Sequence, residues 1–264
     1  MSTIREPAVA GMFYPGDAEE LHAMVQEMLH EVPPVDEPPP KAIIAPHAGY
    51  IYSGPVAASA YARLRKVRKT IERVILLGPS HRVGFPGLAS SSADTFRTPL
   101  GDVPVDTETV ARLAALPQVR ILDQAHQLEH SLEVHLPFLQ ESLEHFTLVP
   151  LVVGDASADE VAEVLELVWG GDETLIVISS DLSHYHDYAT AVRMDRTTSD
   201  AIEQLRPEAL QYEDACGRTP ITGLLRLARR KHLTVETIDL RNSGDTAGPR
   251  DQVVGYGAYL FHAS

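Results

Sequence analysis

The sequence predicts an α/β fold: a single domain over residues 1–264, with a central, mainly parallel or mixed sheet flanked by helices. Short apolar runs rich in β-branched residues alternate with amphipathic stretches, which is typical of this class. A hydrophobic content of 44% and a charged content of 22% are close to the globular average, and 264 residues can still share one core.

The elements follow in order along the chain. Residues 18–31 predict a helix because Asp17 can cap it and Leu21, Val25 and Leu29 share one face. The proline-rich stretch 32–40 predicts a stiff connecting loop, since proline lacks the backbone donor that helices and central strands need. The apolar runs predicted as strands are 42–45, 73–77, 147–153, 174–179, 234–239 and 253–261. The further stretches predicted as helices are 55–65, 107–115, 131–143, 158–168, 189–205, 207–214 and 219–231.

Composition excludes several classes of protein. A formal net charge of -15 without a lysine or arginine cluster argues against a nucleic-acid partner. No apolar run approaches membrane-spanning length, so we expect no membrane partner. The lone Cys216 excludes an internal disulfide and fits a reducing compartment, and residues 1–11 lack the apolar core of a signal peptide. We therefore expect a cytoplasmic protein.

Histidines follow three of the predicted strands. His47 stands in a Pro-His-Ala-Gly corner after the first of these strands, His81 ends a Gly-Pro-Ser-His segment after the second, and His184 follows a third. The carboxyl ends of strands form the crevice of an open α/β sheet, so these rings are expected to converge there. If the first two strands are adjacent, His47 and His81 come within reach of one metal ion. For each ring taken alone, the alternative is a buried histidine bonded to a backbone carbonyl.

Carboxylates accompany these histidines. Asp181 precedes His184 by three residues, so in a helical turn both side chains share a face and the carboxylate can orient the ring. Asp245 stands in the polar loop 242–248, from which it can reach the crevice unless the loop is a plain connection. Two imidazoles and one carboxylate form the facial arrangement of non-haem iron enzymes. His130 is predicted either as a pocket residue or as a helix-surface residue.

Seven segments together resemble the Memo family, in order and nearly end to end. They are residues 11–15, 45–50, 78–81, 96–101, 129–137, 179–184 and 216–220. Prokaryotic members of that family are often named AmmeMemoRadiSam system protein B, which implies a functional association with AMMECR-type and radical SAM proteins. The family is similar in fold to class III extradiol dioxygenases of the LigB type, in which two histidines and a carboxylate hold ferrous iron.

The resemblance implies roles for individual residues. His47 and His81 become metal ligands, and His184 becomes the acid/base histidine with Asp181 beside it; His130 is added to this catalytic set. Animal members supply a cysteine from the loop matching residues 242–248, where Asp245 or Thr246 stands here, and Cys216 belongs to a different motif. We therefore expect Asp245 as third ligand of a divalent transition metal, Fe(II) first, with copper or zinc as alternatives.

Three functions remain open at this stage. The first is a metal-dependent oxidoreductase, related to the extradiol dioxygenases, that acts on a small molecule. The second is a non-enzymatic protein that binds a peptide or protein partner in the same crevice. The third is a metal-dependent hydrolase in which His184 acts as base.

Overall fold

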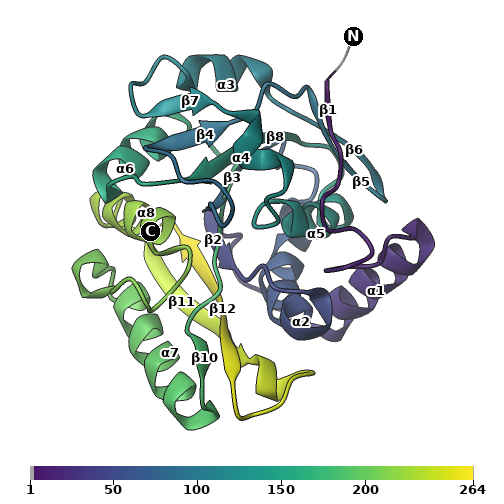
Figure 1. The fold of residues 1–264 in the computed structure, drawn as a ribbon, viewed down its shortest axis with the longest axis vertical. Coiled ribbons are helices and arrows are strands. Elements are labelled where there is room, and N and C mark those ends of the chain that lie inside the picture. Colours follow the sequence, from purple (N-terminus) through teal and green to yellow (C-terminus); the bar gives the residue numbers. More distant parts are fainter. Residues whose placement is uncertain (1–2, 264) are drawn as a thin grey trace.

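A nine-stranded mixed sheet forms the centre of the computed structural model, which describes residues 3–263 (Figure 1). Its strands, in spatial order, are β10 (His184–His186), β12 (Val253–His262), β2 (Ala42–Ala45), β9 (Thr174–Ser179), β3 (Arg73–Pro79), β8 (Thr147–Val153), β4 (Leu88–Ser90) and β7 (Val119–Ile121), and β11 (Thr234–Asn242) pairs with β12. A smaller sheet contains β1 (Ile4–Arg5), β5 (Thr95–Thr98) and β6 (Gly101–Pro104). The expected mixed α/β architecture is confirmed, and the ends of the predicted range 1–264 lie outside the described residues.

The middle of the large sheet is parallel. Strands β2, β9, β3 and β8 run in one direction, whereas β12 and β4 pair with this block in antiparallel fashion. The four residues of β2 and the six of β9 are all buried, as expected for strands covered on both faces. Because the parallel strands end at the same edge, the loops that follow β2, β3 and β9 meet there.

Helices cover both faces of the sheet. In Figure 1, α6, α7 and α8 lie on one side and α1, α2 and α5 on the other. The helices are α1 (Ala18–Glu31), α2 (Tyr50–Tyr61), α3 (Thr107–Leu113), α4 (Asp123–Gln127), α5 (Leu136–Ser142), α6 (Ala158–Leu167), α7 (Tyr188–Glu203) and α8 (Arg218–Arg230), with short 3-10 helices at Ala62–Val67, Glu133–His135, Pro207–Ala209 and Ser243–Asp245. In the described chain, no helix combines the length and the apolar character that crossing a membrane requires.

Some predicted helices differ from the structure. The helix expected at 55–65 begins at Tyr50, whose N–H donates to the carbonyl of Phe13, and continues past Tyr61 as a 3-10 helix. The helix expected at 131–143 is divided into a 3-10 turn and α5. The helix expected at 207–214 is only a 3-10 turn, because the Asp214 carboxylate accepts the N–H of Gln211 and closes a separate turn.

Candidate metal centre

His47 presents one defined nitrogen to the site. Its ring is 2% exposed, and Nδ1 lies 2.6 Å from Ser179 Oγ. The Ser179 hydroxyl donates its own proton to the carbonyl of Ser131 at 2.6 Å, so it must accept from Nδ1–H. Burial and the neighbouring histidines hold the pKa of His47 well below its ordinary value, so the ring is neutral. The lone pair of Nε2 is therefore available as a metal ligand.

His81 is held in the same tautomer by a carboxylate. Glu129 accepts the backbone N–H of His81 at 2.6 Å and its Nδ1–H at 2.8 Å. Burial alone would raise the pKa of Glu129, but its hydrogen bonds with His81 and the N–H of Ser131 outweigh burial and lower the pKa to about 2. A carboxylate that fixes and polarises an imidazole is the usual partner of a histidine that binds metal.

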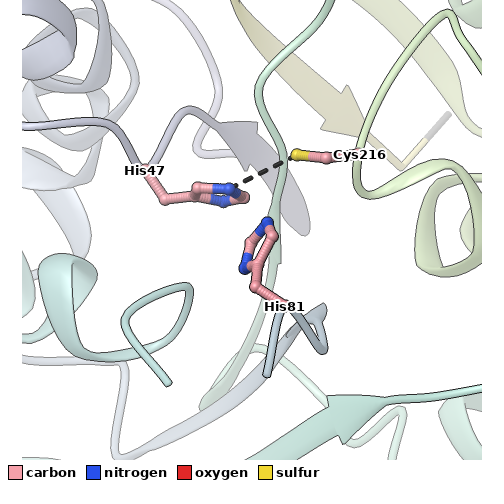
Figure 2. A group of neighbouring side chains, drawn as sticks. All are labelled: His47, His81 and Cys216. Atoms are coloured by element: carbon pink, nitrogen blue, oxygen red, sulfur yellow. Dashed lines mark hydrogen bonds between the residues drawn. The ribbon is translucent and has the colours of Figure 1, made fainter. Parts of the chain in front are cut away.

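Cys216 completes a group of three donors. Its Sγ lies 3.3 Å from His47 Nε2, and the donor atoms of His47, His81 and Cys216 all lie within 4.8 Å of one another (Figure 2). Ligands about 2.0–2.3 Å from a tetrahedral metal are separated by roughly 3.3–3.8 Å. The separation of Cys216 and His47 lies in this range, and a small approach of His81 would let the three donors hold one ion. Burial and the charge of Asp181 raise the pKa of the Cys216 thiol, and binding of a metal must displace its proton.

The backbone around Cys216 fixes the sulfur in place. The N–H of Asp181 donates to Sγ at 3.3 Å, and the N–H of Gly217 donates to Ser180 Oγ at 2.9 Å. A Cβ on Gly217 would lie 2.6 Å from the carbonyl oxygen of Ser179, so only glycine permits this approach of the loop before α8 to the end of β9. Figure 2 shows the thiol approaching from this loop while the two rings come from the β2 and β3 sides.

Three expectations about the ligands need correction. First, β2 and β3 are not adjacent, because β9 lies between them. The rings of His47 and His81, which follow these strands, still lie with centroids 5.1 Å apart, since their loops fold over the end of β9. Second, Cys216 lies with the histidines although it belongs to another motif. Third, Asp245 lies in neither group of candidate ligands found in residues 3–263. Its carboxylate caps the 3-10 turn through the N–H of Asn242 and accepts the hydroxyl of Tyr188 at 2.7 Å.

Asp181 and His184 do not share a helical turn. Residues 184–186 form β10, whose pairing with β12 overrides the local preference for a turn. The Asp181 carboxylate instead accepts the N–H of His47 at 2.8 Å and lies 3.9 Å from His47 Nε2. Burial raises the pKa of Asp181, although its hydrogen bond with His47 and the charges of His184 and His81 oppose this. Asp181 therefore contacts the metal donors, and it makes no hydrogen bond with His184 in the described chain.

His130 lies against the rings of His47 and His81. It stacks on His81 with centroids 4.6 Å apart and meets His47 edge-on at 5.4 Å. Burial and the neighbouring His81 lower its pKa to about 4. Its ring also forms a second possible ligand group with His81 and Glu129. However, Glu129 already accepts three backbone N–H groups and Nδ1–H of His81. Glu129 is therefore better suited to orient His81 as a donor of the His47, His81 and Cys216 group than to bind a metal itself.

An open pocket of about 550 Å³ adjoins the donor cluster. His81, Cys216 and His184 line it together with Arg218 and Tyr185, so His184 faces the same cavity as two of the three donors. This volume is within the usual range for small-molecule sites. A larger pocket of about 720 Å³ lies between residues 3–8 and α4, but it contains none of the predicted site residues.

The fold and the site define an α/β protein with a cluster of side chains that could hold a metal ion at the carboxyl edge of its sheet. Residues 5–260 match the family model described as Memo-like protein. A MEMO1 family protein of Aquifex aeolicus (strain VF5) is 38% identical over 270 residues, covering 98% of this chain and 99% of that protein. One from Sulfolobus acidocaldarius is 37% identical, covering 96% and 97%. The chain belongs to the Memo family.

Among solved structures, the uncharacterized protein JW3007 from Escherichia coli K12 has a similar fold. The match has a TM-score of 0.54 at 11% sequence identity and covers 83% of this chain and 98% of that one. At this identity the likeness concerns the fold alone.

Proposed function

We propose that this protein is a metal-dependent oxidoreductase that holds one divalent transition metal ion between His47, His81 and Cys216. One observation carries the proposal: in both histidines Nδ1–H donates to an acceptor, so the Nε2 lone pairs remain available for a metal. The sulfur of Cys216 lies beside one of them. Structural zinc sites have four protein ligands, whereas catalytic sites have three and an open position. Three donors beside an open pocket favour the catalytic arrangement.

The donor set changes which metal we propose. The expectation of Fe(II) rested on a carboxylate from Asp245, whereas a thiolate with two imidazoles also suits copper and zinc. Iron or copper would supply one-electron and oxygen chemistry in the pocket, which is why an oxidoreductase is our first choice.

The chain's own residues supply binding and proton transfer. Ser179 and Glu129 keep the two imidazoles in the tautomer that leaves Nε2 unprotonated. We assign proton transfer to His184, because it lines the pocket beside Cys216 and is half-buried. His130 stacks on the His81 ring, and Asp181 accepts the backbone N–H of His47, so both help to fix the positions of the proposed ligands.

Metal content after anaerobic purification tests the site. The double variant His47→Ala, His81→Ala should lose stoichiometric metal while keeping its far-UV circular dichroism spectrum. Cys216→Ser should weaken binding strongly, whereas Asp245→Asn should leave it unchanged. Full metal content in the double variant would refute the site. Loss of metal in Asp245→Asn alone would support Asp245 as a ligand instead.

A metal-dependent hydrolase is the second candidate, because His184 on the pocket could also deprotonate a metal-bound water. Oxygen uptake by the iron- or copper-loaded protein with small phenols and thiols, compared with ester hydrolysis by the zinc-loaded protein, separates the two. The implied association with AMMECR-type and radical SAM proteins remains a prediction that co-purification can test.

A further inference from the structure

We propose that Arg218 is an oxyanion-binding residue of this pocket, so that the substrate is a small molecule bearing a carboxylate or a phosphate. That the bound molecule is a substrate depends on the proposed metal centre; the binding of an oxyanion does not. The inference starts from one guanidinium group on the wall of the pocket that also contains His81 and Cys216.

Arg218 is oriented but not neutralised. Its Nε donates to the carbonyl of Leu210 at 2.8 Å, which fixes the plane of the guanidinium group. Neither Nη atom has a hydrogen-bond or ion-pair partner among residues 3–263. Glu213 lines the same pocket, but it forms no ion pair with Arg218 within this part of the chain. An arginine held through Nε offers its two Nη donors as a fork that matches two oxygens of one carboxylate or phosphate.

The surroundings favour a negative ligand at this position. Arg218 is the first residue of α8, and the first turn of this helix contains no acidic residue. The positive end of the helix dipole therefore adds to the charge of the guanidinium group. Arg218 and Cys216 line the same pocket, so an anion bound by the fork would share that pocket with the proposed metal.

The rim of the pocket suits a planar molecule. Tyr185 and Tyr212 line it and are 71% and 86% exposed. The Tyr185 ring also meets the His184 ring edge-on, with centroids 5.8 Å apart. Exposed tyrosines beside an arginine can contact the face of an aromatic acid while the fork binds its oxyanion.

Calorimetric titration of the purified protein with benzoate, phenyl phosphate and neutral benzamide tests the proposal. We expect both anions to bind and benzamide to bind at least about tenfold more weakly, because a neutral amide cannot form charge-assisted hydrogen bonds with both Nη donors. Arg218→Met should reduce the affinity for both anions by about tenfold or more, with metal content unchanged. Arg226→Met is the matched control: it removes an exposed arginine from the same helix, and its anion affinity should equal that of the wild type.

Two results would overturn the proposal: no binding of either anion by the wild type, or equal anion affinity in Arg218→Met and the wild type. If Arg218→Met does not fold, Arg218→Lys replaces it; this variant keeps the charge but loses the fork, so a several-fold loss relative to Arg226→Lys is expected and equal affinity refutes the proposal. Because metal content is measured separately, a protein that binds benzoate through Arg218 but no metal would refute the metal centre alone.

Discussion

Replacing Ser179 by alanine should weaken metal binding although Ser179 touches no metal. Its hydroxyl accepts Nδ1–H of His47 and donates to the carbonyl of Ser131, both at 2.6 Å and both buried. Without the hydroxyl, the proton of the neutral ring can move to Nε2 and block the ligand position. Loss of a hydrogen-bond partner behind a ligating histidine typically costs about 10–100-fold in metal affinity.

The same substitution should also lower the free energy of unfolding. It leaves two buried polar groups without a partner, each costing about 1–3 kcal/mol, so we expect a loss of about 2–6 kcal/mol in the metal-free protein. Competition with a chromophoric chelator measures the metal affinity, and urea unfolding of the metal-free protein measures the stability.

Ser142→Ala is the matched control for Ser179→Ala. The hydroxyl of Ser142 is also buried, at the end of α5, but it has no hydrogen-bond partner among the described residues. Its removal should therefore leave metal affinity unchanged and stability unchanged or slightly raised. If Ser179→Ala loses stability but binds metal as tightly as the wild type, the reasoning about the tautomer of His47 is wrong.

Three further predictions concern the site and the core. Gly217→Ala should displace Cys216 and lower metal affinity about tenfold or more by titration, whereas Gly84→Ala, where a Cβ meets nothing within 4 Å, should not. Burial lowers the pKa of His126 to about 4 from 6.5. The stability that the neutral ring contributes is therefore complete above pH 6.5 and is lost as the pH falls to 4. In urea unfolding, the wild type should lose about 3 kcal/mol more over this pH range than His126→Gln. His184→Ala should retain metal but lower turnover about 10²–10⁴-fold, and loss of metal would instead make His184 a ligand.

The sequence predicted the longer strands of the large sheet and the positions of His47 and His81 at its edge, because both signals are local, whereas the short strands β1, β4, β5, β6, β7 and β10 were not predicted. The strands at 42–45, 147–153 and 174–179 agree with the structure since their apolar runs are continuous. His47 and His81 follow such runs directly, so the edge of the sheet determines where they lie. The helix 18–31 also agrees, because Asp17 caps it through the N–H groups of Glu19 and Glu20.

Cys216 could not be predicted as the third donor, because tertiary contacts alone bring it to the site. It lies 35 residues after Asp181, whose N–H contacts its sulfur, and the position of Gly217 depends on Ser180. Asp245 stays a prediction as a ligand, and the structure gives it a local role that the sequence does contain. Asn242 and Asp245 have the spacing of a capping box, and the structure uses both side chains to cap the 3-10 turn.

The position of β2 in the sheet determines when the site can form. This strand follows α1 early in the sequence, yet its neighbours are β9 and β12, which come more than 120 residues later. During synthesis, the segment that carries His47 therefore has no partner strands until the second half of the chain has emerged, and pairings this distant in sequence form slowly. Cys216 is translated after β9 and before β12. The proposed donors thus come together only in a nearly complete chain, so the proposed site would select its ion after folding.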